Sequence, residues 1–138
     1  MNPIGKWKIR EVMHFTLEDG MAWRTPDELA ALDVDEDSVR MYRTSVLIFN
    51  EDGTAKTLTP LPEGATKEQI DAAIAEGMEI TDGMMVTGKN EWKSEDGKVL
   101  YKTGTVGEVF GEEVSPWIEL NEVDGAIEIE LLRYERAE

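Results

Sequence analysis

The sequence has no cysteine and a single histidine, His14, among its 138 residues. A chain without cysteine can form no disulfide bond and has no thiolate to act as a nucleophile or metal ligand. Basic residues are also scarce, because 14 lysines and arginines face 30 aspartates and glutamates, which leaves a net charge of −16. So acidic a surface repels phosphate groups, and we expect neither a nucleic-acid partner nor attachment to a membrane surface.

Long apolar runs are missing as well. No stretch approaches the roughly 20 apolar residues that span a membrane, and the first residues lack the apolar core of a signal peptide. We therefore expect a cytoplasmic protein, while earlier removal of a signal peptide stays open. The length of 138 residues is typical of one domain, and the hydrophobic fraction of 41% is sufficient for a packed core.

The motifs of catalysis and metal binding are incomplete. His14 is the only residue that could act as the base of a serine triad, and no Gly-x-Ser-x-Gly sequence accompanies it. The stretch Asp33–Asp37 is similar to the opening of a calcium-binding loop, but Ser38 stands where the turn glycine is required. We therefore predict no enzyme, no metal site and no cofactor, and interpret Asp33–Asp37 as a solvated helix end.

The dipeptide Asp-Gly, in contrast, occurs five times. It favours the positive φ angles of the tight turns that join antiparallel strands. Three of the five lie between segments that alternate apolar and polar residues, and these predict three hairpins. The hairpins pair residues 46–49 with 54–61, 84–93 with 99–109, and 115–121 with 126–134.

The alternation also predicts which faces of the strands are buried. Within 126–134, Ile127, Ile129 and Leu131 share one face and glutamates occupy the other. The first strand, 5–15, places four large apolar residues on one face, interrupted by Glu11: Trp7, Ile9, Met13 and Phe15. In the predicted strand 99–109, the glycines of Thr103–Gly107 indicate a bend.

Two short helices are predicted between the strands. The first is capped at Thr25 and ends near Leu32, and the second begins with the capping box Thr66–Gln69 and stops at Gly77. With so little helix, seven or eight strands must hide their apolar faces against one another, and closing the sheet achieves this. We predict a single domain over residues 1–138, mainly β: one antiparallel up-and-down β-barrel of about eight strands with two short helices. A two-layer α+β sheet is the competing architecture.

The two ends of the chain resemble a known superfamily. Gly5-x-Trp7 opens the first strand, and Leu131–Arg136 places arginines and a tyrosine in the last. In these residues the chain resembles the calycins, which comprise the lipocalins and the intracellular fatty-acid-binding proteins. The resemblance implies a barrel whose base is closed by Gly5, Trp7 and an arginine of the last strand, for which we take Arg133. The fatty-acid-binding branch has both helices between its first two strands, whereas the helices predicted here are separated by a hairpin.

The resemblance also implies a function: non-enzymatic binding of one small apolar or amphipathic molecule inside the barrel. The residues expected to line or orient it are Met84, Trp92, Tyr101, Arg43 and Arg133. Arg133 shares a face with Ile129, and Arg43 shares one with Phe49, so each is either a structural cation or the contact for an anionic ligand group.

A second function stays open, because an eight-stranded barrel can also be filled by its own side chains. Such a filled barrel would be an interaction or structural module whose acidic surface binds a basic protein partner. An enzyme that uses carboxylates at the barrel mouth is a third hypothesis. We expect a monomer or a weak dimer, and the sequence identifies neither the ligand nor the pathway.

Overall fold

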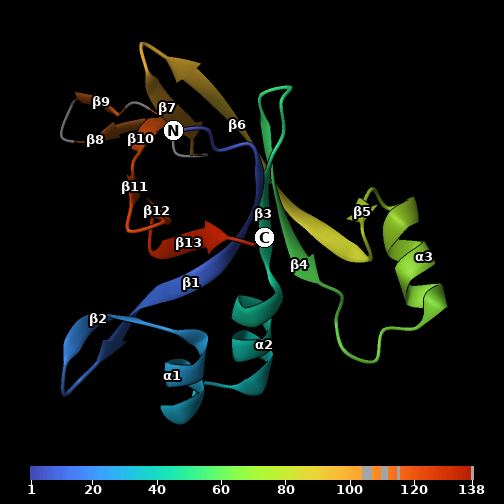
Figure 1. Ribbon diagram of the computed structural model, residues 1–138. Helices are drawn as coiled ribbons and strands as arrows, with labels where there is room; N and C mark the ends of the chain where they lie inside the picture. Colours follow the sequence, from blue (N-terminus) through green and yellow to red (C-terminus); the bar gives the residue numbers. More distant parts are fainter. Residues whose placement is uncertain (104–106, 110–111, 115, 138) are drawn as a thin grey trace.

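The computed structural model describes residues 1–103, 107–109, 112–114 and 116–137 and is drawn in Figure 1. The chain begins with β1 (Gly5–Thr16), β2 (Gly20–Arg24), α1 (Pro26–Ala31), α2 (Glu36–Thr44), β3 (Val46–Phe49) and β4 (Thr54–Pro60). It continues with α3 (Lys67–Ala75), β5 (Ile80–Thr81), β6 (Met84–Glu95), β7 (Lys98–Lys102), β8 (Gly107–Val109) and β9 (Glu112–Val114). The last elements are β10 (Trp117–Leu120), β11 (Glu122–Val123), β12 (Ala126–Ile129) and β13 (Leu132–Arg136). The predicted mainly β class is confirmed. Residues 104–106, where a bend was expected, and residue 115 of the third hairpin lie outside the described ranges.

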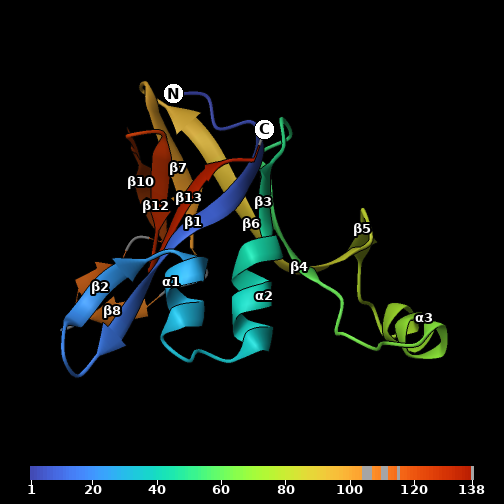
Figure 2. The same ribbon diagram turned by 60° about the horizontal axis from the view of Figure 1, so that its bottom comes forward.

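Most strands belong to one antiparallel sheet, which is strongly curled (Figures 1 and 2). Hydrogen-bonded neighbours follow the order β10-β7-β6-β4-β3-β1-β13-β12-β11, with β2 paired to β1 and β5 to β6 outside this path. The ends of the path, β10 and β11, are consecutive in the chain and separated by Asn121 alone. Because this path has two ends, the sheet is open, and the closed barrel predicted from the sequence is not observed over the described residues.

Asp-Gly pairs occupy the predicted hairpin turns. Asp96-Gly97 joins β6 to β7 and Asp124-Gly125 joins β11 to β12, and all four residues have positive φ angles, as type I′ turns require. Asp52-Gly53 lies between β3 and β4. The first predicted hairpin is confirmed, and the second is confirmed for β6 and β7 but not for residues 107–109, which pair with β9. The third is confined to β11 and β12, because β10 pairs with β7 instead. The remaining pairs, Asp19-Gly20 and Asp82-Gly83, form turns in the β1–β2 and β5–β6 hairpins.

The predicted last strand, 126–134, is in fact two strands. A turn at Glu130 and Leu131 separates β12 from β13, and Glu130 has a φ of 55°. Leu131, expected to be buried beside Ile129, is therefore 58% exposed. This turn contains no glycine or proline, so the pattern of alternation gave no sign of it.

A bulge in β1 likewise changes the predicted faces. Ile9 lies opposite Tyr134 and Glu11 lies opposite Arg133, so Arg10 is an extra residue on β1. An extra residue reverses the alternation beyond it. Val12, predicted to share the polar face, is consequently buried, and Phe15 is 57% exposed.

The segment 36–44, interpreted as an acidic helix exit followed by strand residues, is the helix α2. Asp35 caps it by accepting hydrogen bonds from Ser38 N and Ser38 Oγ, at 3.0 and 2.9 Å. The described part of the chain thus contains three helices instead of two. Two of them, α1 and α2, lie between the β1–β2 hairpin and β3 and form a pair (Figure 2).

The apolar residues form two adjoining clusters. The larger cluster lies within the curled sheet: Trp7, Leu47, Phe49, Ala55, Val99, Tyr101, Leu120, Ile127, Ile129 and Tyr134. The smaller one joins Val12 of β1 to Leu29 of α1 and Val39 of α2. Ile9 and Leu132 pack against both clusters, so the helix pair is anchored to the sheet by continuous apolar contact.

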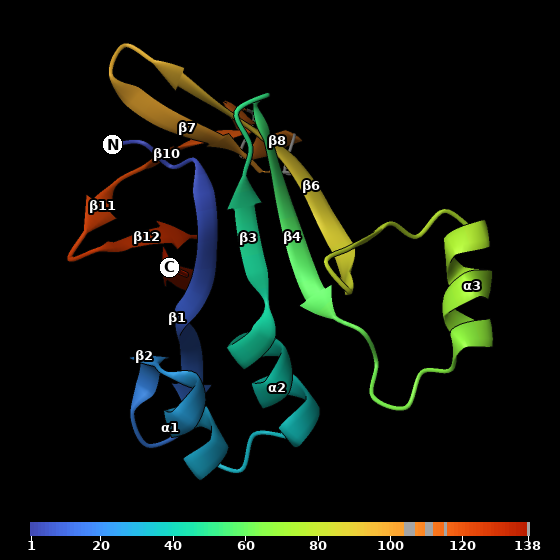
Figure 3. The ribbon, with the colours of Figure 1, turned by 45° about the vertical axis from the view of Figure 1, so that its right-hand side comes forward.

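Helix α3 projects away from the sheet (Figure 3). Its predicted capping box is confirmed, because Thr66 Oγ1 accepts from Gln69 N at 3.2 Å and Gln69 Oε1 accepts from Thr66 N at 3.0 Å. None of its nine residues is fully buried. We call residues 61–83, which contain α3 and β5, the arm. In the described ranges, no helix has the length and apolar character needed to cross a membrane.

Candidate functional site

The first and last strands meet around Trp7, which is fully buried. Its indole Nε1 donates a hydrogen bond to Pro3 O at 2.8 Å, and Arg136 Cζ lies 4.1 Å from the centre of its ring. The Arg136 guanidinium also donates to Ile4 O at 2.9 Å. The arginine that covers Trp7 is therefore Arg136 and not Arg133, because the turn between β12 and β13 changes which residues of the last strand face inward.

Gly5 completes this closure. Its φ of 128° is one that other residues rarely adopt, and a Cβ atom there would lie 3.2 Å from Arg136 Nη1. We expect Gly5→Ala to lower the free energy of unfolding by about 1–3 kcal/mol, measured by urea denaturation. Gly77→Ala is the control, because Gly77 also has a positive φ but has no atom within 4 Å of the added Cβ. Equal losses in the two variants would contradict a role for the contact between Gly5 and Arg136.

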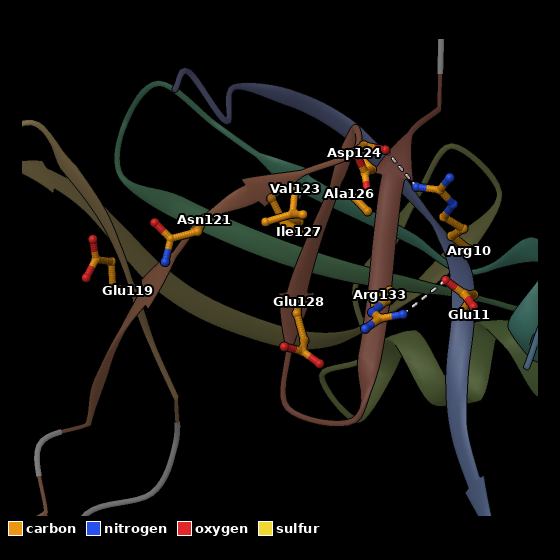
Figure 4. Close-up of a pocket in the computed structure, with 10 residues that line it drawn as sticks. All are labelled: Arg10, Glu11, Glu119, Asn121, Val123, Asp124, Ala126, Ile127, Glu128 and Arg133. Atoms are coloured by element: carbon orange, nitrogen blue, oxygen red, sulfur yellow. Dashed lines mark hydrogen bonds and ion pairs between the residues drawn. The ribbon is translucent and has the colours of Figure 1, made fainter. Parts of the chain in front are cut away.

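Arg133 lies in a different place, a groove on the outer surface of the sheet (Figure 4). Its Cζ atom is 3.9 Å from the centre of the Trp23 ring, and its Nη1 is 3.4 Å from Glu11 Oε1. The groove has a volume of about 480 Å³. It is lined by Arg10, Glu11, Glu119, Asn121, Val123, Asp124, Ala126, Ile127, Glu128 and Arg133.

The charges of this groove do not favour an anionic ligand. Four carboxylates and two guanidinium groups line it, and both guanidiniums already have partners. Arg10 donates to Asp124 O at 2.9 Å and pairs with Glu135 at 3.6 Å, while Arg133 pairs with Glu11. An anionic group entering the groove would have to compete with Glu11 for Arg133, beside three further carboxylates.

Two of the predicted ligand-binding residues lie together inside the curled sheet. The rings of Trp92 and Tyr101 contact Phe49 edge-on, at centroid distances of 6.0 and 6.1 Å. Phe49 also contacts Trp7 at 6.4 Å. Trp92 Nε1 donates to Asn50 O at 2.8 Å, which satisfies its polar atom and fixes the ring against the core.

Tyr101 is accompanied by a second buried tyrosine, Tyr134 of β13. Burial raises the pKa of Tyr101 to about 12, with a smaller contribution from the Glu130 carboxylate. The pKa of Tyr134 is also raised, first by burial and then by the charges that Tyr101 and Glu130 carry when ionised. Within the ranges that the structure describes, neither hydroxyl is hydrogen-bonded to a protein group. The two phenols are therefore neutral groups on buried residues, and their oxygens, which have no protein partner in the described ranges, are not fully enclosed.

The other predicted ligand-binding residues lie elsewhere. Arg43 is on α2, where it is exposed and pairs with Asp27 of α1 at 2.6 Å. Its expected place on the face of Leu47 and Phe49 is wrong, because those residues belong to β3 and Arg43 precedes it on a helix. Met84 starts β6 opposite Pro60 and Thr81, near the arm. The structure therefore brings together Trp92 and Tyr101 and separates them from Met84, Arg43 and Arg133.

His14 and the acidic clusters offer little chemistry. His14 lies opposite Ala22 in the β1–β2 hairpin, half-buried, and its Nδ1 atom is enclosed without a hydrogen bond. The pKa of Asp35 is lowered by its hydrogen bonds from Ser38, as expected of a helix cap. Among the residues described, no three histidine, aspartate or glutamate side chains are grouped so that they could hold a metal ion.

No family model, curated protein or solved structure matches this chain.

A second surface feature of the protein, which the sequence did not predict, lies beside α3. Two grooves of about 570 and 590 Å³ meet there and share Pro62, Glu63, Gly64 and Met85. We call them together the arm groove. The first is lined by Leu61–Ala65, Gln69, Ile70, Ala73, Met78 and Met85, and the second extends to Asp37, Arg40 and Met41 of α2.

Proposed function

We propose that the protein is a non-enzymatic carrier that binds one small apolar or amphipathic molecule, and that its curled sheet is a calycin-like barrel. If β10 and β11 are one strand interrupted at Asn121, the path has eight positions. That strand would pair with β7 along residues 117–120 and with β12 along residues 122–123. The order would then be an up-and-down meander whose first and last strands are neighbours.

Two further features support the calycin-like interpretation. The contact of Arg136 with Trp7 matches the implied closure of the barrel base by an arginine of the last strand. The helix pair α1–α2 precedes β3, the second strand of the meander, which is where the fatty-acid-binding branch has its helices. We also propose, with this branch in mind, a cytoplasmic protein that is a monomer or a weak dimer.

The observation that carries the proposed function is the pair of unpartnered hydroxyls on Tyr101 and Tyr134. Neither hydroxyl oxygen is among the fully enclosed unpaired atoms of the described residues, so each is open to a hydrogen bond from a small molecule, which would contribute about 0.5–1.5 kcal/mol. Apolar side chains surround them, including Trp92 and Ile129. A few convergent polar groups in an apolar environment are typical of small-molecule sites. Both groups are uncharged and lie near Glu130, so the proposed ligand carries a neutral hydrogen-bonding group.

We expect an environment-sensitive apolar fluorophore to bind saturably at one site per chain. Among fatty acids, retinoids, haem and bile acids, we expect a neutral retinoid such as retinol to displace it more readily than the carboxylate ligands. A variant with both Tyr101→Phe and Tyr134→Phe lacks the two hydroxyls. Its affinity for the displacing ligand is expected to be about tenfold lower, because two hydrogen bonds are lost. Tyr42→Phe is the matched control, because Tyr42 lies on α2. Absence of saturable binding, or equal affinities of the wild type, the doubly substituted variant and Tyr42→Phe, would contradict the proposal.

A ligand-free filled barrel is the second candidate function, and one observation favours it. Trp7, Phe49, Trp92 and Tyr101 contact one another edge to face through Phe49, so this part of the interior is packed. A module of this kind would act through its acidic surface on a basic partner. Catalysis has less support, since the shifted carboxyl pKa values among the described residues are all lowered and belong to exposed groups.

A further inference from the structure

The arm groove is an apolar surface whose walls come from two separate parts of the fold. One wall is the arm itself, where Ile70 and Ala73 of α3 face the loop that contains Leu61. The other wall is the body of the protein, with Met85 at the floor of both grooves and Met41 of α2 at the far end. Ile74, one turn along α3 from Ile70, is 47% exposed, so the apolar face of α3 is only partly covered.

Acidic residues line part of this apolar surface, and others lie elsewhere on the arm. The arm, residues 61–83, contains six acids and one lysine, and two of these acids, Glu79 and Asp82, pair with lysines of the sheet. Asp37 and Glu63 line the groove directly. Arg40, the cation in its lining, donates to Leu61 O at 3.2 Å and is thereby held against the protein backbone. The lining of the groove therefore combines apolar side chains with two carboxylates, and its one guanidinium is bonded to the backbone. We call this charged part of the lining the rim.

We propose that the arm groove binds a basic amphipathic helix supplied by a partner protein. The apolar face of such a helix would cover Ile70, Ala73 and Met85, and its lysines and arginines would reach the acids of the rim. Methionine side chains suit this use because they are flexible and polarizable and adapt to different apolar partners. The charge of the whole chain, −16, would accelerate association with a basic partner and hold it in place.

Charge also distinguishes this occupant from the other candidates. A second copy of the chain would bring a further −16 to the same acidic rim, which opposes self-association. A small apolar molecule would leave the carboxylates of the rim without partners. The proposal does not depend on ligand binding inside the sheet, since no residue of the arm groove belongs to the cluster around Tyr101 and Tyr134.

The test uses a fluorescent synthetic peptide of leucine and lysine, in which the leucines line one face of about five helical turns. A peptide of the same composition with the leucines distributed around the helix is the control ligand. We expect the patterned peptide to bind more tightly than the control peptide. The substitution Ala73→Trp, which fills the groove, is expected to weaken binding of the patterned peptide about tenfold. Ala72→Trp is the matched control, because Ala72 is the exposed neighbour of Ala73 on α3, and it should change the affinity less than twofold.

Two additional measurements keep the outcome clear. Circular dichroism establishes that both tryptophan variants fold, and Met85→Gln removes apolar character from the groove without altering α3. Met21→Gln, on exposed β2, is its control. Equal binding of the two peptides, or of Ala73→Trp and Ala72→Trp, would mean that net charge alone attracts them and would overturn the proposal. A dimer that Ala73→Trp dissociates would overturn it in favour of a second copy. Loss of an apolar dye, but not of the peptide, from Ala73→Trp would overturn it in favour of a small molecule. The tyrosine variants should leave peptide binding unchanged.

Discussion

Replacing Trp7 by alanine is expected to lower the free energy of unfolding by about 3–5 kcal/mol, the cost typical of emptying a fully buried aromatic site. The ring is fully buried, so its removal leaves a cavity between β1, β3 and β13. It also takes away the hydrogen bond to Pro3 O and the surface on which Arg136 lies. The free energy of unfolding of a domain of this size is about 5–15 kcal/mol in total. The variant should therefore be partly unfolded or close to it. Urea denaturation followed by far-UV circular dichroism measures the loss.

Trp23→Ala is the matched control for this prediction. Trp23 also stacks with an arginine, Arg133, but it is only half-buried, and we expect a loss of about 1 kcal/mol. Combining Trp7→Ala with Arg136→Ala should recover a coupling energy of about 0.5–2 kcal/mol between the two side chains. If Trp7→Ala were no worse than Trp23→Ala, Trp7 would not be the central residue of the closure.

Alkaline solution is expected to lower the free energy of unfolding progressively between about pH 10 and pH 12. The folded state holds the proton of Tyr101 up to a pKa of about 12, whereas an unfolded tyrosine loses it near pH 10. Because the pKa is raised on folding, this contribution is intact below pH 10 and is lost as the pH rises through the folded-state value. Each tyrosine with a raised pKa lowers the free energy of unfolding by up to about 1.4 kcal/mol per pH unit in this range. Tyr134, whose pKa is also raised by burial, adds to the effect.

Urea denaturation at a series of alkaline pH values gives the stability, and tyrosinate absorbance gives the ionisation. The variant with both Tyr101→Phe and Tyr134→Phe should have a flatter dependence on pH than the wild type. Tyr42→Phe should retain the steep dependence. Ionisation of Tyr101 and Tyr134 near pH 10 without unfolding would mean that these two residues are not buried as described.

Local signals predicted the strands well, because a tight turn depends on a few adjacent residues. Asp96-Gly97 and Asp124-Gly125 adopt the expected conformations, and the caps at Thr25 and Thr66 form as predicted. The helix α2 was missed, since an isolated Asp-x-x-Ser cap is a weak signal and the acidic run around it also fits a loop.

Side-chain faces were harder to predict, because one extra residue reverses them for the rest of a strand. The bulge at Arg10 and the turn at Glu130 are both of this kind, and the second explains why Arg133 was taken for the residue that covers Trp7. The arm groove was beyond prediction for another reason. Its walls, Ile70 and Met85 among them, are brought together by packing between distant segments, and the sequence carries no pattern for such contacts.

The pairing of β1 with β13 has a consequence for synthesis. Trp7 lies opposite Arg136, so strands from the two ends of the sequence are neighbours. A ribosome releases β1 long before β13, and during that interval the edge of β1 that will receive β13 remains uncovered, with the Trp7 ring beside it. Contacts this distant form slowly, and uncovered strand edges promote aggregation. The nascent chain therefore completes this sheet only after β13 has left the ribosome, and until then it would depend on chaperones or on its own strong charge to stay apart from its neighbours.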